Sequence, residues 1–210
     1  MIRMHLYVVR HAQSTMNIGQ GGGPNCDLTE LGRWQAQRLP TFFREIGLDA
    51  IYCSPLRRVI QTAAPLAKAK EMEIVLIPEM SEIFNEAWTD YRDYNWESCS
   101  QIEEEFPDAR FAEHQNKRRR WWPPWPEHEA DVRKRVQVFV NNQLAPLLGK
   151  EAHVAVFGHG QTTADLKRII HPEDSYPAYN AAVAHYELDA AGICIRAALH
   201  TGHLGRHVYE

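Results

Sequence analysis

The alternation of predicted strands and helices indicates an α/β fold, built on a mainly parallel sheet with helices on both faces. Short apolar segments rich in β-branched residues alternate with longer segments whose apolar residues recur at helical spacing. Two of the short segments end in histidine, at His11 and His159. The 210 residues suit a single domain, placed at 1–210, and a hydrophobic content of 44% is enough for a core.

Three strands and two helices are predicted in the first part of the chain. The strands cover 6–9, 51–53 and 73–77 and are short and apolar. Residues 29–46 have a helical apolar pattern that Pro40 should kink or interrupt. Ser54 and Pro55 form a typical helix start, an N-cap followed by proline in the first turn, so a second helix is expected through Ala67.

The second part of the chain contributes three more strands. A strand at 153–157 follows a long predicted helix at 127–148 and precedes another helix. Strands at 182–188 and 193–199 are expected to form a hairpin that turns at 190–192.

Residues 82–126 differ from the rest in composition. They are rich in Trp, Arg, Glu and Pro and have a weak apolar pattern, so they are interpreted as a cap inserted into the domain rather than as core. The run from Arg118 to Trp125 could attract anions at an entrance and stack on a planar group. The tryptophans could instead pack the cap onto the core while the arginines face solvent. We favour packing for the tryptophans and leave both interpretations open for the arginines.

Charge and cysteine usage narrow the setting of the protein. A formal net charge of −4 argues against a nucleic-acid partner, so any phosphate site must come from a local cluster of positive groups. The four cysteines have no CxxC spacing and resemble no disulfide framework, which predicts a reduced, cytoplasmic setting. No apolar run approaches the length of a membrane span, so no membrane partner is expected. The sequence does not specify the oligomeric state.

The residues best suited to chemistry lie where predicted strands end. Ligands of open α/β sheets bind beyond the carboxyl ends of the strands, so His11 and His159 could meet there. Arg10 adjoins the first histidine, and Arg57 and Arg58 lie in the opening turn of the second helix, whose N–H groups also attract anions. Arginine and histidine together suit a dianionic phosphoryl group. Each residue alone also has an ordinary structural explanation, so spacing alone leaves the site undecided.

Four sequence blocks resemble those of the histidine phosphatase superfamily, the phosphoglycerate mutase-like proteins with an RHG motif. The blocks occur in the family's order and span nearly the whole chain outside 90–126. They are RHAQST at 10–15 with Asn17, DLTELGRWQA at 27–36, SPLRRVIQTA at 54–63 and GHG at 158–160, and Asn180 also matches. The resemblance implies a three-layer phosphoglycerate mutase-like fold and a phosphoric monoester hydrolase that needs no cofactor.

The resemblance also implies a role for each matching residue. His11 would attack phosphorus and carry a phosphohistidine. The groups that would hold the phosphoryl oxygens are Arg10, Arg58, His159, Asn17 and the backbone N–H of Gly160. A neutral imidazole is a competent nucleophile near neutral pH, and fixed cations stabilise a transferring phosphoryl group without a metal. The leaving alkoxide needs a general acid whose pKa is raised.

Glu82 is the first candidate for that acid. It follows a predicted strand, and together with Trp88 it resembles the family's ExxxGxW block. Glu86 stands at the glycine position of this block, and Asp90 replaces the glycine that commonly follows, so Glu86 is a second candidate. Glu82 could also be a surface carboxylate at the edge of the cap.

A phosphatase that acts on a small phosphorylated substrate is the favoured function. A cofactor-dependent phosphoglycerate mutase-type phosphotransferase would share the catalytic residues, but segment 19–26 lacks the FxGW stretch typical of those mutases. A catalytically inactive phosphate-binding regulatory module is a second alternative, and the complete set of site residues argues against it. RNA binding through the Arg/Trp run is a third, which the acidic charge balance disfavours. The 11 histidines show no zinc-type pattern, so no metal is expected and activity should survive EDTA.

Overall fold

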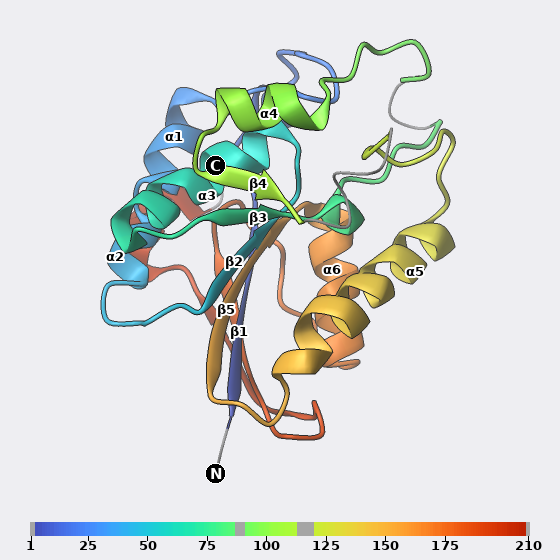
Figure 1. Cartoon of the computed structure of the whole chain (residues 1–210). Helices are drawn as coiled ribbons and strands as arrows, with labels where there is room; N and C mark the ends of the chain where they lie inside the picture. Colours follow the sequence, from blue (N-terminus) through green and yellow to red (C-terminus); the bar gives the residue numbers. More distant parts are fainter. Residues whose placement is uncertain (1–2, 87–90, 113–119, 209–210) are drawn as a thin grey trace.

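The computed structural model describes residues 3–86, 91–112 and 120–208, which form a seven-stranded sheet with helices on both faces (Figure 1). The strand order is β4-β3-β2-β5-β1-β6-β7. The strands from β4 to β1 are parallel, and β6 and β7 continue the sheet in antiparallel fashion. The mainly parallel α/β fold predicted from the sequence is confirmed. The strands are β1 Met4–Arg10, β2 Ala50–Cys53, β3 Ile74–Leu76, β4 Ala109–Phe111, β5 Ala152–Gly158, β6 Val183–Leu188 and β7 Cys194–His200.

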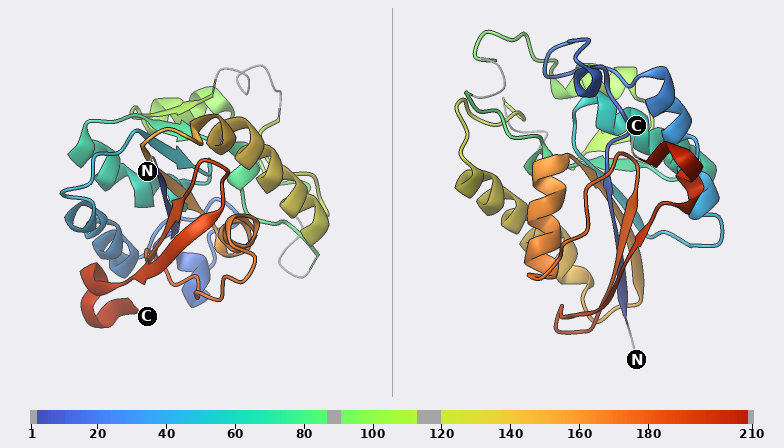
Figure 2. Two further views of the ribbon diagram at one scale, coloured as in Figure 1. Left: turned by 90° about the horizontal axis from the view of Figure 1, so that it is seen from below. Right: turned by 180° about the vertical axis from the view of Figure 1, so that it is seen from behind.

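Two layers of helices enclose the sheet. The helices α2 and α3 cover one face, with α1 against α3, while α5 and α6 cover the other, and the views in Figure 2 show the same layers. No helix in the described ranges is both long and apolar enough to cross a bilayer. The helices are α1 Glu30–Ala36, α2 Leu39–Phe42, α3 Arg57–Lys70, α4 Cys99–Glu105, α5 Glu129–Phe139 and α6 Gly160–Ile170. Shorter turns are the 3₁₀ segments Thr15–Ile18, Pro78–Met80, Ala145–Leu147 and Gly202–Val208 and the π-helical Val140–Leu144.

The sequence of β1 explains why the sheet is buried on both sides. Leu6 and Val8 pack toward α5 and α6, whereas Tyr7 and Val9 belong to the core beneath α2 and α3. All four side chains are almost fully buried. A parallel strand that is covered on both faces therefore reads as a continuous apolar run, and the strand prediction for this segment depended on that property.

The two predictions that involve proline differ in outcome. The helix expected over 29–46 is interrupted as predicted, and Pro40 lies in the first turn of α2. The expectation that Ser54 caps the next helix is wrong, because α3 begins at Arg57 and its N-cap is Leu56. The hydroxyl of Ser54 lies 2.9 Å from a ring nitrogen of His159, so a tertiary contact takes the side chain that capping would use.

The helix predicted over 127–148 is shorter in its regular part. The α-helical geometry of α5 ends at Phe139, and the chain continues through the π-helical and 3₁₀ turns to Leu147. Pro146 lies in the first turn of that 3₁₀ segment, where its missing N–H and its ring are tolerated. The apolar pattern continues across this change of geometry, which is why periodicity alone merged the three segments.

Part of the segment predicted as a cap belongs to the sheet. β4 pairs with β3 in parallel and forms one edge of the sheet, and α4 precedes it. The expectation that 82–126 lies outside the core is therefore wrong for this strand. β4 has three residues, of which only the central Arg110 is exposed, so it is too short to show a strand pattern in the sequence. Residues 87–90 and 113–119, including Trp88, Asp90 and Arg118, lie outside the described residues.

The tryptophans of the Arg118–Trp125 run pack inward, as favoured from the sequence. Trp121 is 4% exposed, and its indole N–H donates to the carbonyl of Glu97 at 2.8 Å. Trp122 and Trp125 are partly buried against the same core. Arg120, the described arginine of the run, donates to two carbonyls of its own loop and lies 5.6 Å above the Trp122 ring, so it stiffens this loop.

Candidate active site

The carboxyl ends of β1 and β5 bring the two predicted histidines together. Arg10 ends β1 opposite Gly158, which ends β5, and the N–H of His11 donates to the carbonyl of Gly158 at 2.9 Å. The rings of His11 and His159 lie 5.3 Å apart between centroids, at an interplanar angle of 61°. The prediction that these distant histidines meet beyond the sheet is confirmed.

His11 is oriented as a nucleophile would have to be. Its Nδ1 lies 2.7 Å from the carbonyl oxygen of Ala12, so Nδ1 carries the proton and Nε2 keeps its lone pair. Burial lowers the pKa of His11 well below its usual 6.5, and the charges of Arg58 and Arg10 lower it further. Asn180 fixes the backbone here, because its side-chain amide donates to the carbonyl of His11 at 2.6 Å. The ring is therefore neutral and held in one tautomer.

Arg58 and His159 form the second half of the site. An arginine Nη2 lies 3.1 Å from His159 Nδ1, and since arginine can only donate, Nδ1 must be the acceptor. The Nε2–H of His159 then donates to the Ser54 hydroxyl at 2.9 Å. Burial, followed by the charge of Arg58, lowers the pKa of His159 well below 6.5. In this state the neutral His159 ring orients the guanidinium of Arg58.

The structure separates the two adjacent arginines. Arg58 is 2% exposed, and its Nη1 donates to the carbonyl of Pro24 at 2.6 Å, so the guanidinium is fixed at the floor of the site. Arg57 turns away and makes a two-armed ion pair with Glu105 of α4, while its N–H donates to Asn25. The choice of Arg58 as the site arginine agrees with this placement. The N–H of Arg57 is consequently not available to an anion.

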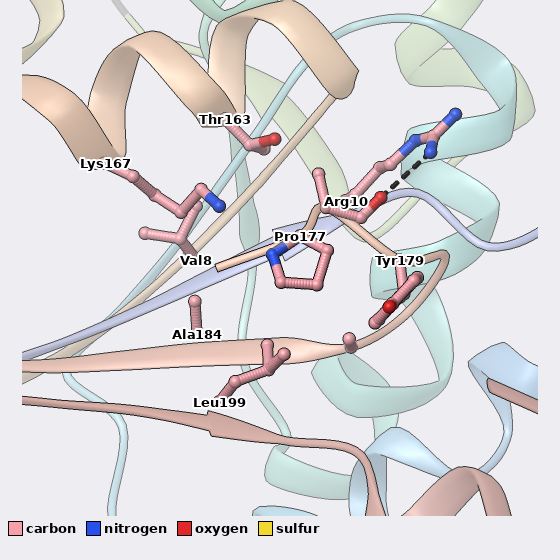
Figure 3. Close-up of a pocket in the computed structure, with 10 residues that line it drawn as sticks. Val8, Arg10, Thr163, Lys167, Pro177, Tyr179, Ala184 and Leu199 are labelled. Carbon is pink, nitrogen blue, oxygen red and sulfur yellow. Dashed lines mark hydrogen bonds between the residues drawn. The ribbon is translucent and has the colours of Figure 1, made fainter. Parts of the chain in front are cut away.

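Arg10 contributes a second fixed cation. Its Nη1 donates to the carbonyl of Ala178 at 2.9 Å, which Figure 3 marks as a dashed line. Its Nε is buried and has no hydrogen-bond partner within the described ranges. A side chain added at Gly160 would begin 3.9 Å from this Nε, so the start of α6 and Arg10 border the same space.

A small cavity of about 10 Å³ lies on the inner side of Arg10, between α6 and β6 (Figure 3). Lys167 of α6 also lines this cavity. Its ammonium donates to the carbonyl of Tyr176 at 2.5 Å and pairs with Asp174 at 3.4 Å. Lys167 therefore anchors the loop before β6 and is already committed to partners other than a phosphate.

Glu82 and Glu86 differ clearly in position. Glu82 Oε2 lies 3.7 Å from His159 Nδ1, and Oε1 accepts from the N–H of Ile83 at 3.0 Å. The side chain keeps 15% of its exposure, and burial raises the pKa of Glu82 above its usual 4.5 against the lowering effect of Arg58. Glu86 is exposed. The placement favours Glu82 as the carboxylic acid of the site.

Gly160 and Asn17, the two other predicted phosphate ligands, differ in how well their positions suit that role. Gly160 forms the first residue of α6, where its N–H belongs to the open end of the helix beside Arg10. Asn17 is exposed, and its Oδ1 accepts from the N–H and the hydroxyl of Ser14, so it caps its own turn. The contact of Asn17 with phosphate stays a prediction.

The structure adds two side chains that sequence reasoning did not assign to the site. Ser54 holds His159, as described above. Thr62 links the two halves of the site, because its hydroxyl accepts from the N–H of Ala12 at 3.0 Å and donates to the carbonyl of Arg58 at 2.6 Å. Both residues lie in the SPLRRVIQTA block, so their presence in that block was the available signal.

A second cluster of possible metal ligands lies away from this site. His5, His185 and Glu187 have ligand atoms within 4.8 Å of one another. However, His5 Nδ1 and His185 Nε2 are 3.0 Å apart and the ring centroids 5.3 Å, the separation expected when the nitrogens point directly at each other. An ion with bonds of about 2.0–2.1 Å does not fit on that line. Glu187 is also paired with Arg3 at 2.6 Å, so the cluster is explained by an imidazole–imidazole hydrogen bond.

Known proteins resemble this chain in sequence and in fold. The family model of the histidine phosphatase superfamily (branch 1) matches residues 6–192. An adenosylcobalamin/alpha-ribazole phosphatase of Escherichia coli is 32% identical over 87 residues, or 40% of this chain and 43% of that protein. Phosphoserine phosphatase 1 of Hydrogenobacter thermophilus is 38% identical over 86 residues, or 40% of this chain and 41% of that protein. The match thus spans about two fifths of the length of either relative.

Solved structures share the fold over a greater length. A phosphoserine phosphatase of Entamoeba histolytica in complex with 3-phosphoglyceric acid has a TM-score of 0.66 at 18% identity, and the alignment covers 96% of this chain and 99% of that one. At 18% identity, this similarity is evidence for the fold alone. Together with the family match over most of the sequence, the conclusion is that this chain belongs to the histidine phosphatase superfamily, branch 1.

Proposed function

We propose that this chain is a phosphatase that hydrolyses small phosphate monoesters through a phosphohistidine on His11. The observation that carries the proposal is the buried, neutral His11 ring, whose Nε2 lone pair is free and lies beside two fixed arginines. Desolvation keeps the imidazole nucleophilic, while the cations favour the charge of the incoming phosphoryl group.

In the first step, His11 Nε2 attacks phosphorus in line with the ester oxygen. The N–P bond forms as the P–O bond to the leaving group breaks. Arg10 and Arg58 hold the equatorial oxygens, and the N–H of Gly160 adds a backbone donor. The buried, unpartnered Nε of Arg10 supports this role, because a phosphoryl oxygen would supply the acceptor it needs.

Glu82 supplies the proton that the departing alkoxide requires. Its raised pKa keeps a share of the carboxyl groups protonated at a pH where an exposed glutamate is ionised. In the second step a water attacks the phosphohistidine, the carboxylate of Glu82 takes its proton, and inorganic phosphate is released. The cycle returns His11 to the neutral form and Glu82 to the acid form.

His159 changes partner when substrate binds, in this proposal. A phosphate dianion raises the pKa of a neighbouring imidazole, so His159 can take up a proton and donate through Nδ1 to a phosphoryl oxygen. Nη2 of Arg58 then exchanges its 3.1 Å hydrogen bond to the ring for one to the phosphate, while Nη1 keeps its bond to the carbonyl of Pro24. Ser54 keeps the other ring nitrogen in place throughout.

The relatives named above support a small phosphorylated metabolite as the substrate. One is named a phosphoserine phosphatase and the other an alpha-ribazole phosphatase. Release of inorganic phosphate to water separates this function from the mutase-type alternative, in which a second hydroxyl accepts the group.

Hydrolysis of p-nitrophenyl phosphate in EDTA tests the proposal. The wild type should turn over, and His11→Ala should lose at least about three orders of magnitude in kcat. His185→Gln, at the other end of the sheet, is the matched control and should stay within about twofold of the wild type. Equal activity of the wild type and His11→Ala would remove His11 as the nucleophile, and loss of activity that only added metal restores would contradict the mechanism.

A further inference from the structure

Arg135 of α5 reaches across to the loop that carries Glu82. Its Nη1 donates to the carbonyl of Glu79 at 2.5 Å, and its Nη2 donates to the carbonyl of Glu82 at 3.2 Å. One guanidinium thus holds both ends of the four-residue turn that ends at the proposed acid. The side chain is 15% exposed, so these bonds are largely shielded from water.

The same guanidinium is locked by a buried carboxylate. Arg135 Nε lies 2.7 Å from Glu127 Oε1 and Nη2 lies 2.9 Å from Oε2, a two-armed ion pair, and Glu127 is 2% exposed. The N–H of Glu127 donates to the carbonyl of Phe84 at 2.8 Å. The carboxylate and its backbone therefore fasten the chain on the far side of Glu82 as well.

From these contacts we infer that Arg135 and Glu127 act as one positioning unit, which sets the distance of the Glu82 carboxyl from the leaving-group oxygen. The inference rests on the proposed function, in which Glu82 is the general acid. The planar fork of arginine serves four acceptors on three residues at once, and a lysine ammonium at the same place cannot match that geometry. A shift of about 1 Å at the acid can cost 10²-fold in rate.

A positioning role makes a prediction that a merely structural role does not. p-Nitrophenolate leaves readily without a proton, whereas the serine alkoxide of phosphoserine needs the acid. Arg135→Lys should therefore lower kcat for phosphoserine by about 10- to 100-fold and kcat for p-nitrophenyl phosphate by less than about threefold. Arg133→Lys, an exposed arginine of the same helix, is the control and should leave both rates unchanged.

Glu127→Gln provides a second variant in case Arg135→Lys folds poorly. It should produce the same discrimination between the two esters, and the double variant should be no worse than the more impaired single variant, because the pair acts as a unit. Equal loss on both esters in the folded variants, or no loss on either, would overturn the inference.

Glu82→Gln, measured alongside, separates this inference from the proposed function. If Glu82→Gln fails to discriminate between the two esters, the assignment of the acid falls, and the inference falls with it. If Glu82→Gln discriminates and both Arg135→Lys and Glu127→Gln do not, the acid stands and the positioning role alone is refuted.

Discussion

Two pairs of histidines lie across the central strands, one at each end of the sheet, and they share more than their residue type. His11 and His159 meet beyond the carboxyl ends of β1 and β5. His5 and His185 meet on β1 and β6 toward the other end. Burial lowers the pKa of all four rings, and that of His185 falls to about 4. Neutral imidazole is therefore common to both pairs.

The partners of the rings distinguish the two ends. His5 and His185 bond to each other, and the nearby Glu187 is paired with Arg3, so the groups in that pair satisfy one another. His11 and His159 do not bond to each other, and their neighbours are Arg10 and Arg58. The candidate site differs from the other pair because two arginines and the free lone pair of His11 converge on one space. Histidine count and proximity alone would have selected both ends equally.

Glu82→Gln should give the largest effect among the variants that sharpen this contrast. The substitution removes the proton donor but keeps the shape, so kcat for a phosphate monoester with an alkoxide leaving group should fall by about 10²–10⁴-fold. The active form needs neutral His11 and protonated Glu82. Because burial lowers the pKa of His11, the midpoint of the acid limb of the wild-type profile should lie well below pH 6.5. Because burial raises the pKa of Glu82, the midpoint of the basic limb should lie above pH 4.5.

Rate–pH profiles of the wild type and Glu82→Gln check this prediction. The residual activity of the variant should lack the basic limb, since no carboxyl group remains to lose its proton. A basic limb that persists unchanged in the variant would assign the acid elsewhere, with Glu86→Gln as the next variant to measure.

Ser54→Ala should have an intermediate effect. It leaves the buried Nε2–H of His159 without an acceptor, which costs about 1–3 kcal/mol of unfolding free energy. The freed ring should also loosen its hold on Arg58 and lower kcat by about tenfold. Denaturant unfolding and steady-state kinetics measure the two effects, with the exposed Ser100→Ala as the control. A fully stable and fully active Ser54→Ala would show that His159 is oriented without this bond.

His185→Gln should have the smallest effect, visible only in the pH dependence of stability. In the wild type the unfolded histidine binds a proton near pH 6.5 and the folded one near pH 4, so the unfolded state gains protons first as the pH falls. The stabilising contribution is present above pH 6.5 and is lost as the pH falls toward 4. The variant should therefore lose less Tm than the wild type between pH 7 and pH 5, by roughly a few °C. Parallel Tm profiles would contradict the assigned shift.

The sequence predicted the layers of the fold because the central strands carry local signals. The apolar runs of β1 and β5 are continuous since both faces of those strands are buried. β4 gave no such signal, because three residues with one exposed arginine show no periodicity. Its place in the sheet depends on pairing with β3, which is a contact between segments and not a property of either one.

The candidate site shows the same division between residues with a local sequence signal and residues placed by contacts between distant segments. Arg10, His11, Arg58 and His159 were found because they stand at strand or helix ends in blocks with a family resemblance. The hydrogen bond between Ser54 and His159 and the hydrogen bonds from Arg135 to the Glu82 loop were not predicted, because each joins residues far apart in sequence. The choice between Glu82 and Glu86 likewise needed the position of the carboxyl group relative to His159.

Trapping the phosphoenzyme tests the central claim most directly. Wild-type protein mixed rapidly with radiolabelled p-nitrophenyl phosphate and quenched in alkali should retain label on the peptide that contains His11. The label should be acid-labile and alkali-stable, as a phosphohistidine is, and it should be absent from His11→Ala. Label on any other residue, or turnover of the wild type with no labelled intermediate under conditions where hydrolysis of the intermediate is slow, would contradict the covalent mechanism proposed for this site.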